Sequence, residues 1–170
     1  YGTDFPRFLD EFEPAREMPY LGGVARLDLL WTNVHCAIDE PGLELSDLSQ
    51  FTETELGNLW LAPRAAAGWL WLPDCPAYTI WRVNREQLEM PEELEWRGEG
   101  ALLTRKAGRV HWQPASAADC AFLDACTAHL PLDLAADKAI EAEPDLNLEN
   151  LIIRLVSADA FVSMDLGLSS

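Results

Sequence analysis

Four cysteines and three histidines are the side chains of this chain best suited to metal or redox chemistry. No two cysteines form a C-x-x-C pair, and only His35 and Cys36 are neighbours, whose side chains point about 100° apart on a helix. We therefore expect reduced thiols in a cytoplasmic protein, and no metal, cofactor or disulfide in this chain. The residues concerned are Cys36, Cys75, Cys120, Cys126, His35, His111 and His129.

Carboxylates are the second set of side chains that could do chemistry, because a pair of them can act as general acid and general base. A solvated acidic surface accounts for those that cluster here, and the chain has no G-x-S-x-G, phosphate-loop or H-E-x-x-H motif. We therefore predict that the chain is not an enzyme. The clustered carboxylates are Glu92, Glu93, Glu95, Asp119 and Asp124.

The charge balance limits the partners of the chain. Twelve Lys and Arg face 29 Asp and Glu, a formal charge of −17, which repels nucleic acid and anionic membranes. A basic or neutral peptide or protein fits this charge better. No apolar run approaches the roughly 18 to 20 residues that cross a bilayer, so we expect no membrane partner either.

The central part of the chain predicts a hairpin that leads into a helix. Apolar and polar residues alternate in Ala101–Lys106 and in Arg109–Pro114, on either side of Ala107-Gly108. Ser116 is a suitable N-cap with Asp119 three residues later, and apolar residues then recur at helical spacing to Leu130. Further elements are expected in order: a third strand at Leu94–Trp96, a helix from Asp133 to about Glu143, a last helix capped by Asp145 or Asn147, and a closing strand at Ala160–Met164.

The first half is predicted to be mainly helical. Its strongest pattern runs from Pro19 to Ile38, where apolar residues step by three and four. Thr52 with Glu55 forms a capping-box pattern. The remaining expectations are a short helix from about Asp4, one or two short helices within 45–57, strands at Leu59–Leu61 and Trp69–Leu72, a short helix from Ala77 to Glu86, and a linker at Met90–Glu93.

Four stretches of the first half carry a family resemblance: YGTDFPRFLDEF, PYLGGVARLDLLW, LWLAPRA and AYTIWRVN. In this order they resemble accessory proteins encoded beside multinuclear non-haem iron oxidative enzymes, which modify cysteine-containing precursor peptides in methanobactin-type and bufferin-type pathways. The resemblance implies a non-catalytic subunit that binds the iron-dependent oxidase and the leader of the precursor peptide, with the iron in the oxidase. Some relatives carry a DNA-binding label.

The resemblance also implies a fold. We expect an α+β protein in which a helical partner-docking region, residues 1–90, precedes a winged-helix-like peptide-recognition module, residues 91–170, with a small antiparallel sheet and then three helices. In such modules the leader peptide adds a strand to the sheet edge and packs against the third helix. The candidate peptide-binding residues are Arg109, Val110, His111, Trp112 and Gln113 in the strand and Asn150, Ile153 and Arg154 in the last helix.

Two questions stay open at this point. Trp and Arg are enriched at interface hot spots, which nominates Tyr20, Arg26, Trp31, Trp69 and Trp81 for contact with the oxidase. The alternative, that a given Trp belongs to the core, is favoured for each Trp and for Trp112, because large aromatic side chains dominate core burial. The alternative function, a DNA-binding transcriptional regulator, rests on the element order and the label of some relatives. It requires a basic recognition helix, whereas Arg154 is the only cation of the last helix.

Overall fold

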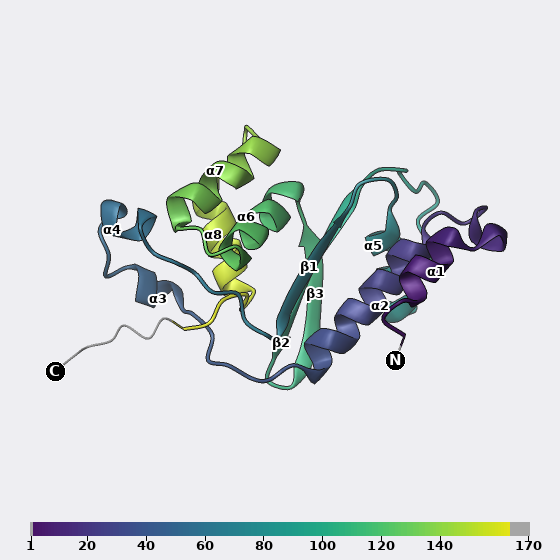
Figure 1. Cartoon of the computed structure of the whole chain (residues 1–170), viewed down its shortest axis with the longest axis horizontal. Helices are drawn as coiled ribbons and strands as arrows, with labels where there is room; N and C mark the ends of the chain where they lie inside the picture. Colours follow the sequence, from purple (N-terminus) through teal and green to yellow (C-terminus); the bar gives the residue numbers. More distant parts are fainter. Residues whose placement is uncertain (1, 164–170) are drawn as a thin grey trace.

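The computed structural model describes residues 2–163, which fold as a mixed α+β protein of three layers (Figure 1). A three-stranded antiparallel sheet forms the middle layer, with strand order β1-β2-β3. Helices α2 and α5 cover one face, and helices α6, α7 and α8 cover the other. The strands are β1 (Ala67–Leu72), β2 (Glu99–Lys106) and β3 (Arg109–Ala115).

The hairpin of β2 and β3 is confirmed at the predicted position. The connection is the dipeptide Ala107-Gly108, and both residues have positive φ, 49° and 75°. Two consecutive left-handed residues are typical of the type I′ turn, whose twist matches that of the strands it joins. Lys106 therefore pairs with Arg109 directly beside the turn, and Leu103 pairs with Trp112 further along.

One face of the sheet packs against α2 (Leu21–Cys36) and α5 (Ala77–Glu86). Gly68 permits the close approach of α2, because a Cβ at this position would lie 2.5 Å from Cδ1 of Leu30. The long predicted helix ends at Cys36, since Ala37 is already extended, and Ile38 is exposed. The shared core on this side includes Leu27, Val34, Tyr78, Trp81, Ala101 and Leu103.

The other face packs against α6 (Ala117–Thr127), on which α7 (Leu132–Ala142) packs in turn, and α8 (Leu148–Ser157) shares the core of this layer. The caps predicted for two of these helices are confirmed: the Ser116 side chain accepts from the backbone N–H of Asp119, and Asn147 accepts from that of Asn150. The shared core on this side includes Phe122, Leu123, Leu151, Leu155 and Phe161.

Short helices complete the chain at either side of the molecule. They are α1 (Phe5–Glu11), a 3₁₀ turn η1 (Glu13–Ala15), α3 (Leu45–Leu48) and α4 (Glu53–Gly57). The capping box of Thr52 and Glu55 at the start of α4 is confirmed. No helix in residues 2–163 combines the length and apolar character that crossing a bilayer requires.

Three strand predictions need correction. Residues 59–61 form no strand. They lie in an irregular segment in which Leu61 is buried and the backbone carbonyl of Leu59 accepts from the backbone N–H of Leu132. Residues 94–96 form no strand either: the free side of β2 is occupied by β1, which is the strand predicted at Trp69–Leu72. At the predicted closing strand, Phe161 and Val162 make only isolated bridges, and Met164 lies outside the described residues.

The sheet links the two halves of the chain. Strand β1 belongs to the range 1–90, whereas β2 and β3 belong to 91–170. The core beneath α6–α8 likewise includes Leu43 and Leu61 from the first range. The two ranges therefore contribute strands to the same sheet. That they have separate functions stays a prediction.

Candidate functional site

The outer edge of β3 carries backbone groups without a partner. Lys106 and Arg109 form the hydrogen-bonded pair beside the turn, so the residues of β3 alternate from there. Val110 and Trp112 consequently direct their N–H and C=O away from β2, and Pro114 directs only its C=O away, because proline has no N–H. Within residues 2–163, no backbone hydrogen bond reaches this outer side. Among the described residues, strand β3 is thus an open edge of the sheet.

One flank of this edge is formed by aromatic side chains from α2, α5 and β3. Trp112 is half-buried, its indole N–H donates to Oε1 of Glu86 at 2.7 Å, and its ring lies edge-on to Trp81. The guanidinium of Arg85 lies 4.0 Å from the ring centroid of Trp31 and 5.7 Å from that of Trp112. The ring of Trp112 therefore packs partly in the core, while the backbone of the same residue forms part of the outer edge of β3.

The other flank is a cavity between β3 and the C-terminal end of α8. Its volume is about 230 Å³. On α8, Asn150, Ile153 and Arg154 share one exposed face, because they are three and four residues apart. Arg154 pairs with Asp119 in the first turn of α6, so this ion pair joins α8 to the helix that follows β3. The cavity is lined by Leu102, Thr104, Lys106, His111, Trp112, Gln113, Ser157 and Ala158.

Of the residues nominated for peptide binding, His111, Trp112 and Gln113 line this cavity, whereas Arg109, Val110, Asn150, Ile153 and Arg154 do not. Val110 and Trp112 lie on the α2 side of β3, and Arg109, His111 and Gln113 lie on the α8 side, as the alternation predicts. Ile153 exposes 40% of its surface on the face of α8 that also carries Asn150 and Arg154. The prediction missed five lining residues, because they join this cavity only through tertiary packing: Leu102, Thr104, Lys106, Ser157 and Ala158.

The residues nominated for oxidase contact do not form one surface. Trp81 is 2% exposed and donates its indole N–H to Asp28 at 2.8 Å, so its side chain belongs to the core. Trp69 is half-buried against the opposite face of the sheet, where its N–H donates to Asp124. Tyr20 lies edge-on to Trp96, Arg26 pairs with Asp10, and Trp31 lies under Arg85.

The exposed tryptophans are other ones. Trp60, Trp71 and Trp96 expose 50%, 40% and 55% of their surface. Trp60 lies against the imidazole of His129, with ring centroids 4.2 Å apart. Sequence reasoning did not separate these from the core tryptophans, because the count and spacing of Trp residues do not show which side of a strand or loop is covered.

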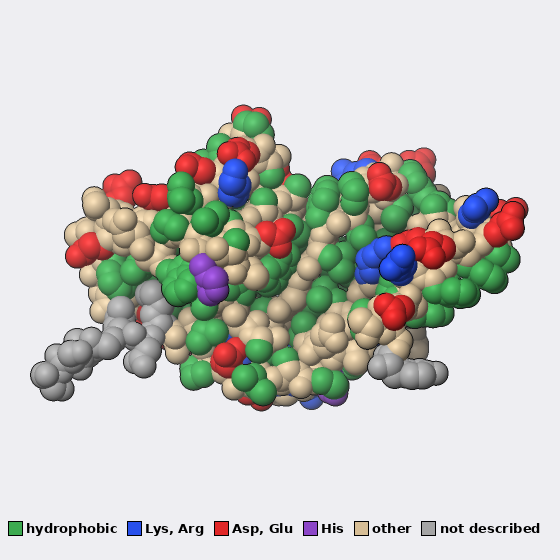
Figure 2. All heavy atoms as spheres, viewed as in Figure 1, with side chains coloured by type: hydrophobic (Ala, Val, Ile, Leu, Met, Phe, Trp, Pro, Cys, Tyr) green, Lys and Arg blue, Asp and Glu red, His purple; other side chains and the backbone are tan. Residues whose placement is uncertain are grey.

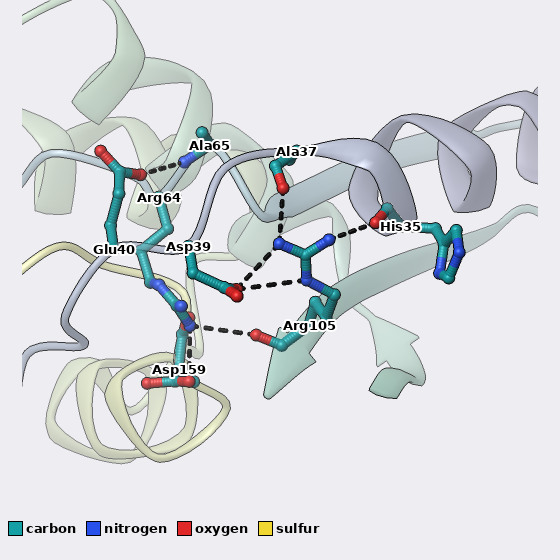
Figure 3. Close-up of polar contacts among 8 residues, drawn as sticks. All are labelled: His35, Ala37, Asp39, Glu40, Arg64, Ala65, Arg105 and Asp159. Carbon is teal, nitrogen blue, oxygen red and sulfur yellow. Dashed lines mark hydrogen bonds and ion pairs between the residues drawn. The ribbon is translucent and has the colours of Figure 1, made fainter. Parts of the chain in front are cut away.

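Two buried arginines fix the hairpin relative to its neighbours (Figure 3). Arg105, at the end of β2, donates to the backbone carbonyls of His35 and Ala37 and to the carboxylate of Asp39. Arg64 donates to the carbonyl of Arg105 at 3.2 Å and to the carboxylate of Asp159 at 2.5 Å. The two side chains thus connect the end of α2, the end of β2 and the turn after α8, which borders the cavity.

Buried thiols show no sign of reactivity. Burial raises the pKa of Cys126 to about 12, and burial together with the nearby carboxylates raises that of Cys120 to about 12. Burial also raises the pKa of Cys75, whereas Cys36 is exposed. Within residues 2–163, no three His, Cys, Asp or Glu side chains are grouped so that they could hold a metal ion.

Comparison with protein-family models, with curated proteins and with solved structures found no match for this chain.

Proposed function

We propose that this chain is a non-catalytic accessory subunit that binds a precursor peptide by strand addition along β3 and presents it to an iron-dependent oxidase. The observation that carries the proposal is the open outer edge of β3, with a cavity on one flank and aromatic side chains on the other. The resemblance of the first half to accessory proteins of peptide-modifying oxidases supports the choice of ligand and partner.

Strand addition suits an accessory subunit that handles an extended leader peptide. Backbone hydrogen bonds supply affinity that tolerates many sequences, and pockets for alternate side chains supply selectivity. The edge offers five outward backbone groups, the N–H and C=O of Val110 and Trp112 and the C=O of Pro114. At roughly 0.5–1.5 kcal/mol net for each hydrogen bond, these contribute only a few kcal/mol, so side-chain contacts on the two flanks must add the rest.

The order of the elements supports a winged-helix-like recognition module. Along the chain the hairpin of β2 and β3 is followed by three helices, while β1, which completes the sheet, precedes α5, and the third helix, α8, borders the same cavity as β3. A peptide on the edge of β3 would therefore contact the exposed face of α8. Ile153 is the apolar side chain on that face and is a suitable anchor contact.

The oxidase would bind elsewhere on the first half, so that the peptide edge stays accessible. In this proposal the nominated contacts that remain are Tyr20, at the N-cap of α2, and Arg26 and Trp31 within α2, all three partly exposed. Co-expression of this chain with the neighbouring iron-dependent oxidase should give a stable complex on size-exclusion chromatography, with the iron in the oxidase. Failure of the two proteins to co-purify at micromolar concentration contradicts the oxidase part of the proposal.

Peptide binding is tested by Val110→Pro. The substitution removes an N–H that points away from β2, so the hairpin should keep its ladder while the docked peptide loses one backbone hydrogen bond and meets the proline ring. We expect at least a tenfold loss of affinity for the leader peptide, which corresponds to about 1.4 kcal/mol. Fluorescence polarisation with a labelled leader peptide measures the change.

Val110→Thr is the matched control, since threonine is also β-branched and keeps the backbone N–H. Its affinity should stay within about threefold of the parent chain. Circular dichroism and thermal unfolding establish that both variants are folded. Equal affinity of folded Val110→Pro and the parent chain would show that the peptide does not use this edge.

A further inference from the structure

Most, but not all, of the basic side chains in this acidic chain lie next to a carboxylate. Nine of the twelve Lys and Arg side chains have a carboxylate within 4.0 Å among the described residues. The other three are Arg16, Lys106 and Arg109. Two of these three, Lys106 and Arg109, face each other across the hairpin as a register pair at the start of the open edge.

This arrangement costs stability. Like charges directly opposite each other on adjacent strands are unfavourable, and a Glu at either position would replace repulsion with attraction. His111 follows on the same face of β3, and it lines the cavity beside α8 together with Lys106. We call Lys106, Arg109 and His111 the basic strip.

The nearby carboxylates are held by other donors. Lys106 also lines a larger cavity of about 660 Å³, whose acidic lining residues are Asp39, Glu40, Glu44 and Asp159. Glu44 accepts from the hydroxyl of Ser46 at 3.4 Å. Asp39 pairs with Arg105, Asp159 pairs with Arg64, and Glu40 accepts from the backbone N–H of Ala65 at 2.6 Å (Figure 3). The basic strip is thus left without an internal counter-charge in the part of the chain that the structure describes.

We propose that the basic strip recognises acidic side chains of the peptide that pairs with β3. The inference rests on the proposed function and adds the charge pattern of the ligand. Side chains of a docked strand share a face with those directly opposite, so residues opposite Arg109 and His111 would lie two positions apart and both face the strip. The preferred ligand therefore carries two Asp or Glu residues, in the pattern acid-x-acid, at the end that lies beside the Ala107-Gly108 turn.

The net charge of −17 does not oppose this preference. At physiological salt the Debye length is about 8 Å, so carboxylates farther than this from the strip have little effect on a docked peptide, and the nearer Asp39, Glu40 and Asp159 each accept from another donor. On the face that Figure 2 shows, acidic side chains lie over both helical layers, whereas basic side chains are fewer. A local basic strip on such a molecule also gives a docked peptide one preferred register.

A display library of random 12-residue peptides, selected on the full chain, tests the inference. The enriched peptides should contain the acid-x-acid pattern. The most enriched peptide, synthesised with a fluorescent label, should bind the double variant Lys106→Gln/Arg109→Gln about three- to tenfold more weakly than the parent chain. Raising NaCl from 50 to 300 mM should weaken its binding to the parent chain more than to the double variant.

Arg16→Gln is the control. It also removes a cation that has no carboxylate within 4.0 Å among the described residues, but Arg16 is far from β3 in the sequence. The labelled peptide should bind this variant with the same affinity as it binds the parent chain. The double variant should unfold at no lower temperature than the parent, because it loses a repulsion.

Enriched peptides without acidic residues, or equal affinity for the double variant, overturn the inference. If Val110→Pro still abolishes binding in that case, the peptide binds the β3 edge but does not depend on the basic strip. If no peptide is enriched, or Val110→Pro binds normally, the proposed function fails as well.

Discussion

At the scale of single residues, the positions that decide the geometry of the site are two arginines inside apolar segments. Arg64 is 6% exposed, and it bonds the end of β2 to the turn after α8. Asp159, its partner, has a positive φ of 66°, a conformation that Asp tolerates better than most residues. The pair holds the hairpin against α8 and so maintains the cavity beside β3.

Replacing Arg64 with Met should therefore destabilise the fold. The change leaves the largely buried carboxylate of Asp159 without its partner, and breaking such a pair costs about 3 kcal/mol. Urea unfolding followed by circular dichroism measures the loss. The double variant Arg64→Met/Asp159→Asn should recover part of it, and Arg16→Met, at an exposed position, should stay within about 0.5 kcal/mol of the parent. A loss below about 1 kcal/mol for Arg64→Met would contradict this role.

At the scale of elements, α6 is the helix that joins the hairpin to the helical layer. Its N-terminal capping box follows β3 directly, and its inner face is almost entirely buried. Two of its buried residues are the thiols Cys120 and Cys126, and burial raises the pKa of both from 9.0 to about 12. In the folded chain these two thiols therefore keep protons that they release above pH 9 in the unfolded chain.

Stability should consequently decrease as pH rises from about 9 to 12, while these thiols leave it unchanged below pH 9. The native state binds more protons than the unfolded state in this window, and each such group contributes up to about 1.4 kcal/mol per pH unit. Tyr78, with its pKa raised by burial to about 12, adds to the decrease above pH 10. Urea midpoints between pH 7.5 and 10.5 under reducing conditions measure the slope.

Cys126→Ala provides the comparison. It lowers stability at every pH because it removes buried volume, but its alkaline slope should be shallower than that of the parent by one group. Identical slopes would show that Cys126 does not hold its proton through folding.

At the scale of the whole molecule, the sheet is the common element of both halves. Strand β2 lies between β1 from the first half and β3 from the second, and each face of the sheet is covered by its own helical layer (Figure 1). We expect neither half to keep its core when the other is lost, because β1 would lose its strand neighbour β2, and β2 would lose both β1 and the helices that cover one of its faces.

We therefore expect one cooperative unfolding transition for the full chain. Thermal unfolding monitored by far-ultraviolet circular dichroism and by tryptophan fluorescence should give the same midpoint, since five of the seven tryptophans lie before residue 90 and two after it. Two separate midpoints, or a calorimetric enthalpy clearly different from the van't Hoff enthalpy, would indicate that residues 1–90 and 91–170 unfold independently.

The sequence by itself determined the local elements. Alternation around Ala107-Gly108 located the hairpin, and the side chains of Ser116, Thr52 and Asn147 located helix starts, because turn geometry and capping depend on neighbouring residues only. The facing of Val110 and His111 to opposite sides of β3 followed from the same alternation. These features need no knowledge of distant contacts.

Only the tertiary structure decided which segments meet. It placed β1, and not residues 94–96, beside β2; it buried Trp81 and exposed Trp60; and it assembled the cavity from β2, β3 and the end of α8. Strand partners and burial depend on competition among all apolar segments for the same surfaces, which periodicity within one segment does not record. For the same reason the absence of a counter-charge at Lys106 and Arg109 becomes visible only when the positions of the carboxylates in residues 2–163 are known.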